Sequence, residues 1–248
     1  MGSRVQLCEL SRLQLRGLKL NTSLVIATAW KITNKIGVFE VFMARRKTEK
    51  IKIMVSSSVY GMEDELRQIY GLLNGYGFKV WMSHMGSVPK NPGQSAFEAC
   101  LAAAENCDFF FGIIRTQYGS GRADRDEKSI THLEVQKAIN LNKPRFFIAD
   151  EKVVLARRIL TDLGYKGPEG RAELDLKKGA QIIDDLKVLD MYEDAIQDAV
   201  DLDKRVDNWV QAYSNRDDIF RIVNEQFNRH DELKKILRVQ AEQTNEGA

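Results

Sequence analysis

The chain has 248 residues, of which 44% are hydrophobic and 29% charged, and its formal net charge is +2. This is the composition of an ordinary globular protein, long enough for one large domain with appendages. So small a charge bias argues against a nucleic-acid or anionic-membrane partner, and no apolar run reaches the roughly 18 to 20 residues that a membrane span needs. Three cysteines without metal-ligand spacing cannot form a disulfide framework, which favours buried thiols in a reducing, cytoplasmic compartment.

The first part of the chain differs in composition from the rest. Residues 1–42 carry six Lys and Arg against two Glu, and their apolar patch at 24–30 is too short to cross a bilayer. We interpret 1–47 as a basic N-terminal extension outside the domain; a basic, acid-poor segment is also typical of an organellar transit peptide. The domain itself is predicted at 48–230, followed by a C-terminal helix and polar tail at 231–248.

From residue 50 the chain alternates between strand-like and helix-like patterns. Strands are expected where short runs of apolar residues occur, and helices where apolar residues recur at three- and four-residue spacing. Because the run at 108–114 is apolar throughout, both of its faces should be covered, as in a central parallel strand. The predicted strands are 51–56, 78–82, 108–114 and 145–149, and the helices between them are 62–76, 94–107 and 129–141.

This alternation stops after the fourth strand. Residues 151–205 are charged and mostly helix-forming, so we interpret them as a helical insertion or cap. A fifth strand is predicted at 208–213, and Ser214 then resembles a helix N-cap with Asp217 as its capping-box partner. An apolar helix and a short helix at 231–239 follow.

Five strands alternating with helices predict an α/β fold. We expect a flavodoxin-like parallel five-stranded sheet with helices on both faces and the helical insertion before the last strand. The strand order chosen for it is 2-1-3-4-5.

Polar residues gather after the predicted strands, where open α/β sheets bind their ligands. Small hydroxyl residues and glycines there present N–H and O–H groups to a phosphate or a ribose. Three positions carry alternatives: Ser58 as the cap of the first helix, Arg115 as a solvated charge rather than a phosphate partner, and Tyr118 as a half-buried aromatic rather than a base-stacking ring. The candidate ligand-binding residues are Ser56, Ser57, Ser58, Ser83, Arg115, Tyr118, Gly119 and Ser129.

Glu134 is the candidate catalytic residue. It follows a Gly-rich loop at 118–121 and lies near the start of a predicted helix, so its carboxylate should face the strand ends. A carboxylate there can bind ribose hydroxyls or stabilise an oxocarbenium-like centre as an N-glycosidic bond breaks. The alternative is structural, because Thr131 to Glu134 fits a capping box. No metal-ligand set is apparent, and His84 and His132 are expected in a loop or on a helix surface.

Three motifs that occur in order resemble those of a known family. They are 53–57 (IMVSS) with acidic residues in the helix after it, 107–114 (CDFFFGII) with Tyr118 and Gly119 after it, and 128–134 (KSITHLE). Together they resemble the bacterial domain-of-unknown-function family four-zero-six-two, over roughly 52–150 and less clearly over 185–227. That family is similar to TIR domains and nucleoside deoxyribosyltransferases, which share a flavodoxin-like fold.

The resemblance implies a role for Glu134. In both related groups a glutamate in a Ser-to-Glu segment carries N-glycosidic chemistry, and Glu134 matches it by motif position. The helix start differs from the transferase pattern, since 128–131 reads KSIT where the transferases have Asp and Gly-Thr.

These observations predict a nucleotide-ligand domain. The first hypothesis is an N-glycosidase, NAD hydrolase or nucleoside transferase that uses the Glu134 carboxylate, with NAD as a candidate substrate and no cofactor. The alternative is a non-catalytic module for nucleotide sensing or protein–protein signalling, TIR-like in shape only, with self-association or a signalling partner. A phosphoacceptor receiver is argued against, because Ser56 and Arg115 stand where receivers need acidic residues.

Overall fold

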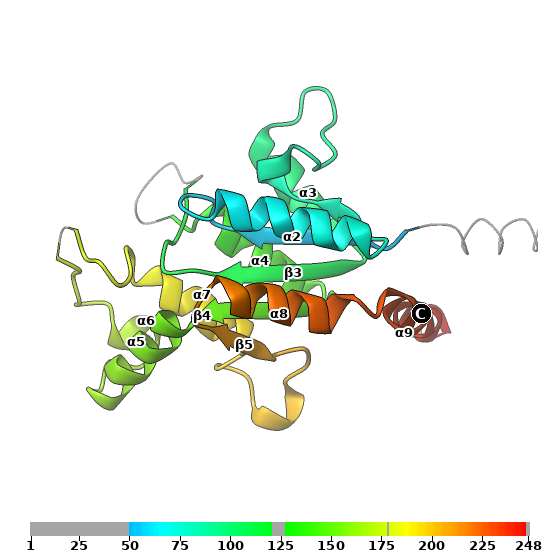
Figure 1. The fold of residues 1–248 in the computed structure, drawn as a ribbon. Helices are drawn as coiled ribbons and strands as arrows, with labels where there is room; N and C mark the ends of the chain where they lie inside the picture. Colours follow the sequence, from blue (N-terminus) through cyan, green and yellow to red (C-terminus); the bar gives the residue numbers. More distant parts are fainter. Residues whose placement is uncertain (1–49, 121–126, 178, 247–248) are drawn as a thin grey trace, which may run out of the picture. The chain divides into compact units, whose positions relative to one another are not determined.

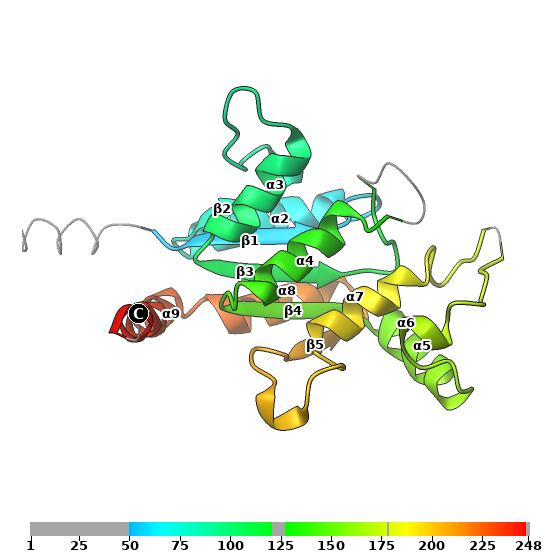
Figure 2. The same cartoon turned by 180° about the vertical axis from the view of Figure 1, so that it is seen from behind.

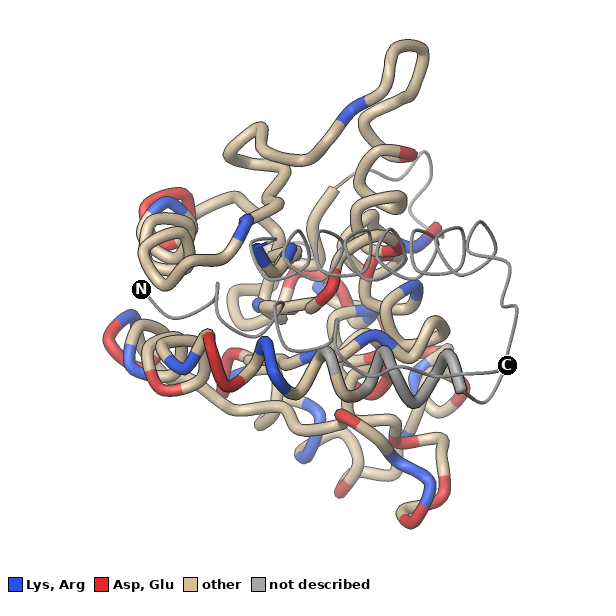
Figure 3. The backbone as a smooth tube through the Cα atoms, turned by 90° about the vertical axis from the view of Figure 1, so that its right-hand side faces the viewer, with Lys and Arg blue, Asp and Glu red and all other residues tan. Residues whose placement is uncertain are grey.

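The computed structural model of the protein describes residues 50–120, 127–177 and 179–246 (Figure 1). The predicted basic extension at 1–47 lies outside these residues. In the described part of the chain, no helix is both long enough and apolar enough to cross a membrane. Lys and Arg are interspersed with Asp and Glu along the described backbone (Figure 3), in keeping with the nearly balanced charge of the sequence.

A five-stranded parallel sheet forms the centre of the domain, in the order β2-β1-β3-β4-β5. Val55 lies opposite Phe111, which in turn lies opposite Phe146, so the most apolar strand takes the central position. The predicted fold class and strand order are therefore confirmed. The strands are β1 (Lys52–Ser57), β2 (Lys79–Trp81), β3 (Phe109–Ile114), β4 (Arg145–Asp150) and β5 (Val210–Tyr213).

Helices cover both faces of the sheet, as a parallel sheet requires. One face carries α2 (Glu63–Gly75) and α8 (Arg216–Phe227), which we call the α2/α8 layer (Figure 1). The other carries α3 (Ala96–Asn106), α4 (Ile130–Asn140) and α7 (Lys187–Ala195), which we call the α3/α4/α7 layer (Figure 2).

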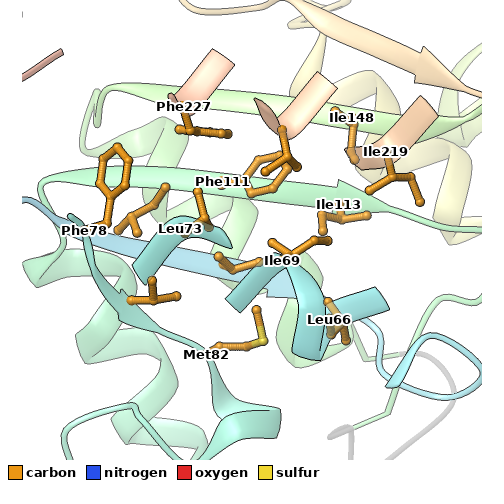
Figure 4. Packing of buried hydrophobic residues seen from close by; sticks show 14 of the residues in the cluster. Leu66, Ile69, Leu73, Phe78, Met82, Phe111, Ile113, Ile148, Ile219 and Phe227 are labelled. Carbon is orange, nitrogen blue, oxygen red and sulfur yellow. The ribbon is translucent and has the colours of Figure 1, made fainter. Parts of the chain in front are cut away.

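The α2/α8 layer has a continuous apolar core. Alternate residues of β1, such as Ile53 and Val55, face α2. They are buried together with Leu66, Ile69 and Leu73 of that helix. Phe227 at the end of α8 lies near Phe78 and Phe111 (Figure 4). Its ring is 5.0 to 6.2 Å, centroid to centroid, from those of Phe78, Phe109, Phe111 and Phe146.

The opposite face of the sheet is built from a mixture of large and small residues. Phe147 of β4 lies over Gly112 of β3, where an added Cβ would stand 2.4 Å from a carbon of that ring. Glycine is therefore required at 112 for the Phe147 ring to fill this part of the core.

The predicted insertion packs partly against the sheet. It contains α5 (Glu151–Asp162), α6 (Gly167–Gly170), α7 and a 3-10 turn, η3 (Leu202–Lys204). Val188, Leu189 and Ala195 of α7 are fully buried, so α7 is the crossover helix between β4 and β5 rather than an external cap. Buried Arg171 donates to Glu193 of α7 at 2.7 Å and thereby ties the α6 segment to this helix.

The C-terminal part corrects two boundaries. The N-cap of α8 is Asn215, whose side chain accepts from the Asp218 amide, whereas Ser214 donates to the Asp218 carboxylate at 2.7 Å. The predicted cap at Ser214 is therefore wrong by one residue. The Ser214 and Asn215 side chains can both accept a hydrogen bond from a helix amide, so the sequence alone does not show which of them is the N-cap. The last helix, α9 (His230–Glu246), extends beyond the predicted 231–239.

Candidate functional site

A buried contact joins the end of β1 to α4. Ser56 Oγ donates a hydrogen bond to Glu134 Oε2, across 78 residues of sequence, and both side chains are buried. Ser56 lies on the same face of β1 as Met54, because side chains alternate along a strand, and this face is covered by the α3/α4/α7 layer. The predicted proximity of these two site residues is therefore present in the fold.

Glu134 does not cap α4. The helix begins at Ile130, and its N-cap is Ser129, whose buried Oγ accepts from the His132 amide at 3.3 Å. Thr131, Glu134, Val135 and Ala138 are all buried, which places Glu134 in the middle of the helix face that meets the sheet. The capping-box alternative is wrong because the cap lies two residues earlier than that pattern requires.

Burial changes the chemistry of the Glu134 carboxyl group. Loss of solvent around the side chain raises its pKa to about 7, against the opposite effect of hydrogen bonds from Ser56 and Cys100. The carboxyl group is therefore divided between its acidic and ionised forms near neutral pH. A group so balanced can donate a proton or carry a negative charge without a large change of conditions.

Cys100 of α3 completes the surroundings of Glu134. Burial and the neighbouring Glu134 charge together raise the pKa of its thiol to about 12. Burial likewise raises the pKa of the Cys107 thiol to about 11. Both cysteines are unpaired and buried, as predicted, and the high pKa values make them poor nucleophiles. Nothing in the sequence spacing connects Cys100 with Glu134; only the packing of α3 against α4 does so.

The two other serines after β1 hold the loop that follows. Ser58 Oγ donates to the Gln117 carbonyl at 2.8 Å, and Ser57 Oγ donates to the Ser58 carbonyl at 2.9 Å. The N-cap position of α2 is Met62, so the alternative role of Ser58 as a helix cap is wrong. Ser58 instead ties the end of β1 to the end of β3.

Arg115 strengthens the same connection. It is half-buried, and its Nη1 donates to the Ser58 and Tyr60 carbonyls at 3.2 and 2.8 Å. The alternative of a simply solvated charge is therefore wrong, because part of the guanidinium is committed to the backbone of the loop after β1.

Gly119 permits a close approach of three segments. Its φ is +90°, and an added Cβ would stand 3.3 Å from the Ser58 Cβ and 3.5 Å from the Thr131 Oγ1. The positive φ and the short contacts both favour glycine. The loop after β3 thus lies against both the loop after β1 and the first turn of α4.

Tyr118 is 1% exposed and belongs to a hydrogen-bonded chain that runs from the core to the partly exposed Asp194. Its hydroxyl lies 2.7 Å from His132 Nδ1, His132 Nε2 lies 2.9 Å from Asp194 Oδ2 of α7, and Gln136 donates to the same oxygen at 2.7 Å. A carboxylate only accepts, so the neutral ring carries its proton on Nε2 and Nδ1 accepts from the tyrosine.

These hydrogen bonds show that the prediction for His132 was wrong and that Tyr118 is not available to stack on a base. His132 is 1% exposed rather than on a helix surface, because α7 covers the side of α4 that the sequence left unassigned. Burial opposes ionisation of Asp194, but the bonds from His132 and Gln136 outweigh it and hold the pKa of Asp194 below its ordinary value. Tyr118 is neither open to a base nor half-buried, since its ring is enclosed.

Ser83 stands apart from this cluster. It is exposed at the end of edge strand β2 and begins a 3-10 turn, η2 (Ser83–Met85), in which its carbonyl accepts from the Gly86 amide at 2.9 Å.

The structure thus brings Ser56, Ser58, Gly119, Ser129 and Glu134 together around two loops and one helix end. Within the described residues, no group of three or more His, Cys, Asp and Glu side chains is arranged to hold a metal ion.

Comparison with known protein families identifies the family of this region. Residues 52–241 match the family model described as a domain of unknown function, DUF4062. No curated protein matches the chain. The matched region begins at the first residue of β1 and ends within α9, so it contains the whole sheet and every residue of the candidate site.

Proposed function

The chain belongs to the DUF4062 family of domains of unknown function, and from the candidate site we propose that it cleaves or transfers the N-glycosidic bond of a nucleotide or nucleoside. The observation that carries this proposal is the state of Glu134: a buried carboxyl group at the carboxyl ends of the strands, bonded by Ser56, with a pKa of about 7 and no role in capping its helix. The motif position that Glu134 shares with the glutamate of TIR domains and nucleoside deoxyribosyltransferases supports the same chemistry.

The Glu134 carboxylate would act on the charge that develops at the sugar. As the bond between C1′ and the base nitrogen breaks, its electron pair leaves with the base and positive charge grows on the ribosyl group. A fixed carboxylate stabilises that charge, and water, or in a transferase a ring nitrogen of a second base, adds to C1′ and releases a proton.

The protonation state of Glu134 required by the reaction depends on the base. The nicotinamide of NAD is already cationic and leaves as a neutral molecule, so no acid is needed and the ionised carboxylate is the active form. A neutral nucleobase leaves more easily if it receives a proton, which only the acidic form of Glu134 can give. Because the pKa is about 7, cleavage of NAD should accelerate as the pH rises through about 7, whereas cleavage of a neutral nucleoside should slow.

A second candidate function is favoured by the exposure of Glu134, which is only 4%. The Glu134 carboxyl group already has a hydrogen-bond partner in Ser56, so it can also have a structural role. The domain would then sense a nucleotide without turnover, or signal by self-association or by binding a protein partner. For either function we propose the cytoplasm as the compartment, in which unpaired thiols such as Cys100 and Cys107 persist.

The test is release of free base from NAD and from a panel of nucleosides, measured by chromatography on the full chain and its Glu134→Gln variant. Glutamine keeps the size and the acceptor for Ser56 but removes the charge, so turnover should fall by on the order of 10² to 10³. Glu105→Gln is the matched control, because Glu105 is an exposed carboxylate on neighbouring α3 that pairs with Lys137 of α4 at 3.0 Å; its rate should equal that of the wild type.

Two results would count against the enzyme. If the wild type releases no base from any of these compounds, the catalytic proposal is wrong, and nucleotide affinity then decides between sensing and protein–protein signalling. If Glu134→Gln works as fast as the wild type, the carboxylate has no part in the reaction.

A further inference from the structure

A large aromatic ring stands in solvent beside the candidate site. Tyr60 is 84% exposed and follows β1 by three residues, at the sheet edge where Ser56 contacts Glu134. Tyr60 is four positions after Ser56 in the chain, so their Cα atoms are at most about 14 Å apart, which is the scale of one nucleotide. The ring therefore lies within reach of a ligand whose sugar is next to Glu134.

The backbone that carries Tyr60 is a closed turn. The Met62 amide donates to the Val59 carbonyl at 2.9 Å, and Gly61 has a φ of +75°. Tyr60 and Gly61 are thus the two corner residues of a four-residue turn, with glycine at the corner that demands a positive φ. A corner residue projects away from the chain on either side, in accordance with the exposure of this ring.

Arg115 fixes the turn from the neighbouring strand. Its Nη1 donates to the Tyr60 carbonyl at 2.8 Å and to the Ser58 carbonyl at 3.2 Å, which joins the turn to the end of β3. A ring on a backbone tied in this way loses little conformational freedom when a ligand covers it, and this lowers the entropic cost of binding.

The ring of Tyr118, one of the candidate ligand-binding residues, is enclosed by the protein. Tyr118 is 1% exposed, and its hydroxyl is bonded to His132. Trp209, another exposed aromatic residue, directly precedes β5 and so lies at the amino-terminal edge of the sheet. Among the aromatic residues that the structure describes, Tyr60 is the most exposed, and it lies at the carboxyl edge together with the Ser56–Glu134 pair.

We infer that the Tyr60 ring is the stacking platform for the planar base of the ligand whose N-glycosidic bond Glu134 addresses. This inference rests on the proposed function and adds the recognition element that it lacks. One ring face packs against the base while the sugar reaches toward Ser56 and Glu134. Since every base has a π-face, such a platform recognises planarity rather than one particular base.

The experiment measures equilibrium binding by calorimetry in the full chain carrying Glu134→Gln, so that turnover does not consume the probe. The probes are NAD, the four common ribonucleosides and, without a base, ribose 5-phosphate. Adding Tyr60→Ala should weaken binding of the base-containing probes by roughly 5- to 150-fold, the range seen when stacked aromatics are removed, and should leave ribose 5-phosphate binding unchanged. Tyr60→Phe should bind as the parent does, because the ring is kept.

Trp209→Ala is the matched control, since it removes another exposed aromatic ring, 69% exposed, from the opposite edge of the sheet and should leave the binding of every probe unchanged. If Tyr60→Ala binds NAD and the nucleosides as tightly as its parent, the platform is refuted while the proposed function stands. If Tyr60→Ala weakens ribose 5-phosphate equally, the substitution has disturbed the loop, and stacking is refuted as the cause. If no probe binds the parent and the wild type releases no base, both proposals fail, and a protein partner becomes the better occupant of this edge.

Discussion

The two helical layers bury different kinds of residue against the same sheet. The α2/α8 layer is apolar throughout, with aliphatic side chains from both helices and a group of phenylalanine rings around Phe227. The α3/α4/α7 layer contains, among its apolar residues, the buried Ser56–Glu134 pair and the Tyr118–His132–Asp194 chain, in which Tyr118 and His132 are buried and the Asp194 side chain is 39% exposed. Burying polar groups in this way is costly unless every partner is in place, so we assign stability chiefly to one layer and chemistry to the other.

The largest expected effect is in the apolar layer. Phe227→Ala removes a buried ring that packs against four others, and it should lower the free energy of unfolding by ~3–5 kcal/mol. Phe97→Ala, at a 37% exposed position at the start of α3, is the control and should cost less than ~1 kcal/mol. The measurement is chemical denaturation of both variants. A similar loss for both would remove the contrast between a packed and an exposed ring.

The next effect is in the polar layer and depends on pH. The folded pKa of Glu134 is about 7, above the ordinary value of 4.5 for a glutamate, so the folded state holds the proton more tightly than the unfolded state. The stability contributed by this group is complete below about pH 4.5 and is lost as the pH rises through about 7, a decrease of about 3 kcal/mol. Glu134→Gln has no carboxyl group to ionise and so does not lose this stability. The unfolding free energy of the variant minus that of the wild type should therefore be larger at about pH 8 than at about pH 4.5.

The measurement is the difference in unfolding free energy between variant and wild type at the two pH values, since other titrating groups cancel in that difference. Glu173→Gln, at an exposed position, is the control and should show nearly the same difference at both. If Glu134→Gln behaves like the control, the Glu134 carboxyl group is solvated in the folded protein and the electrostatic basis of the proposed function is wrong.

The smallest effect compares two tyrosine hydroxyls, one in each layer. Tyr118→Phe removes the buried donor to His132 and should cost about 1 kcal/mol, because the Nδ1 acceptor loses its partner in the core. Tyr76→Phe removes a hydroxyl that donates to Asn224 at 2.8 Å at the exposed junction of α2 and α8, where water replaces it, and should cost clearly less. The measurement is the melting temperature of each variant relative to the wild type. An equal decrease for both would show that the two hydroxyls stabilise the fold to the same extent.

Local patterns predicted most of the architecture. The runs of apolar residues placed the strands within one or two residues, because burial on both faces leaves an unbroken apolar segment. The polar residues after the strands placed Ser56 and Glu134 in one candidate site, since the carboxyl ends of parallel strands share one edge of the sheet, but their direct hydrogen bond was not predicted. The cap at Asn215 and the length of α9 were missed because adjacent polar residues satisfy a helix end almost equally well.

The order of the elements, the parallel sheet and the edge at which polar residues lie could all be predicted from the sequence, because each follows from short-range periodicity and from chain direction. Only the tertiary structure decided that Glu134 lies in the buried face of α4 and that Cys100 is its neighbour. It also decided that Asp194, 62 residues away from His132, closes the chain to Tyr118, and that Tyr60 rather than Tyr118 is open. The physical reason is that exposure and pKa depend on which distant segments exclude water from a side chain, and the local pattern around that side chain carries no record of them.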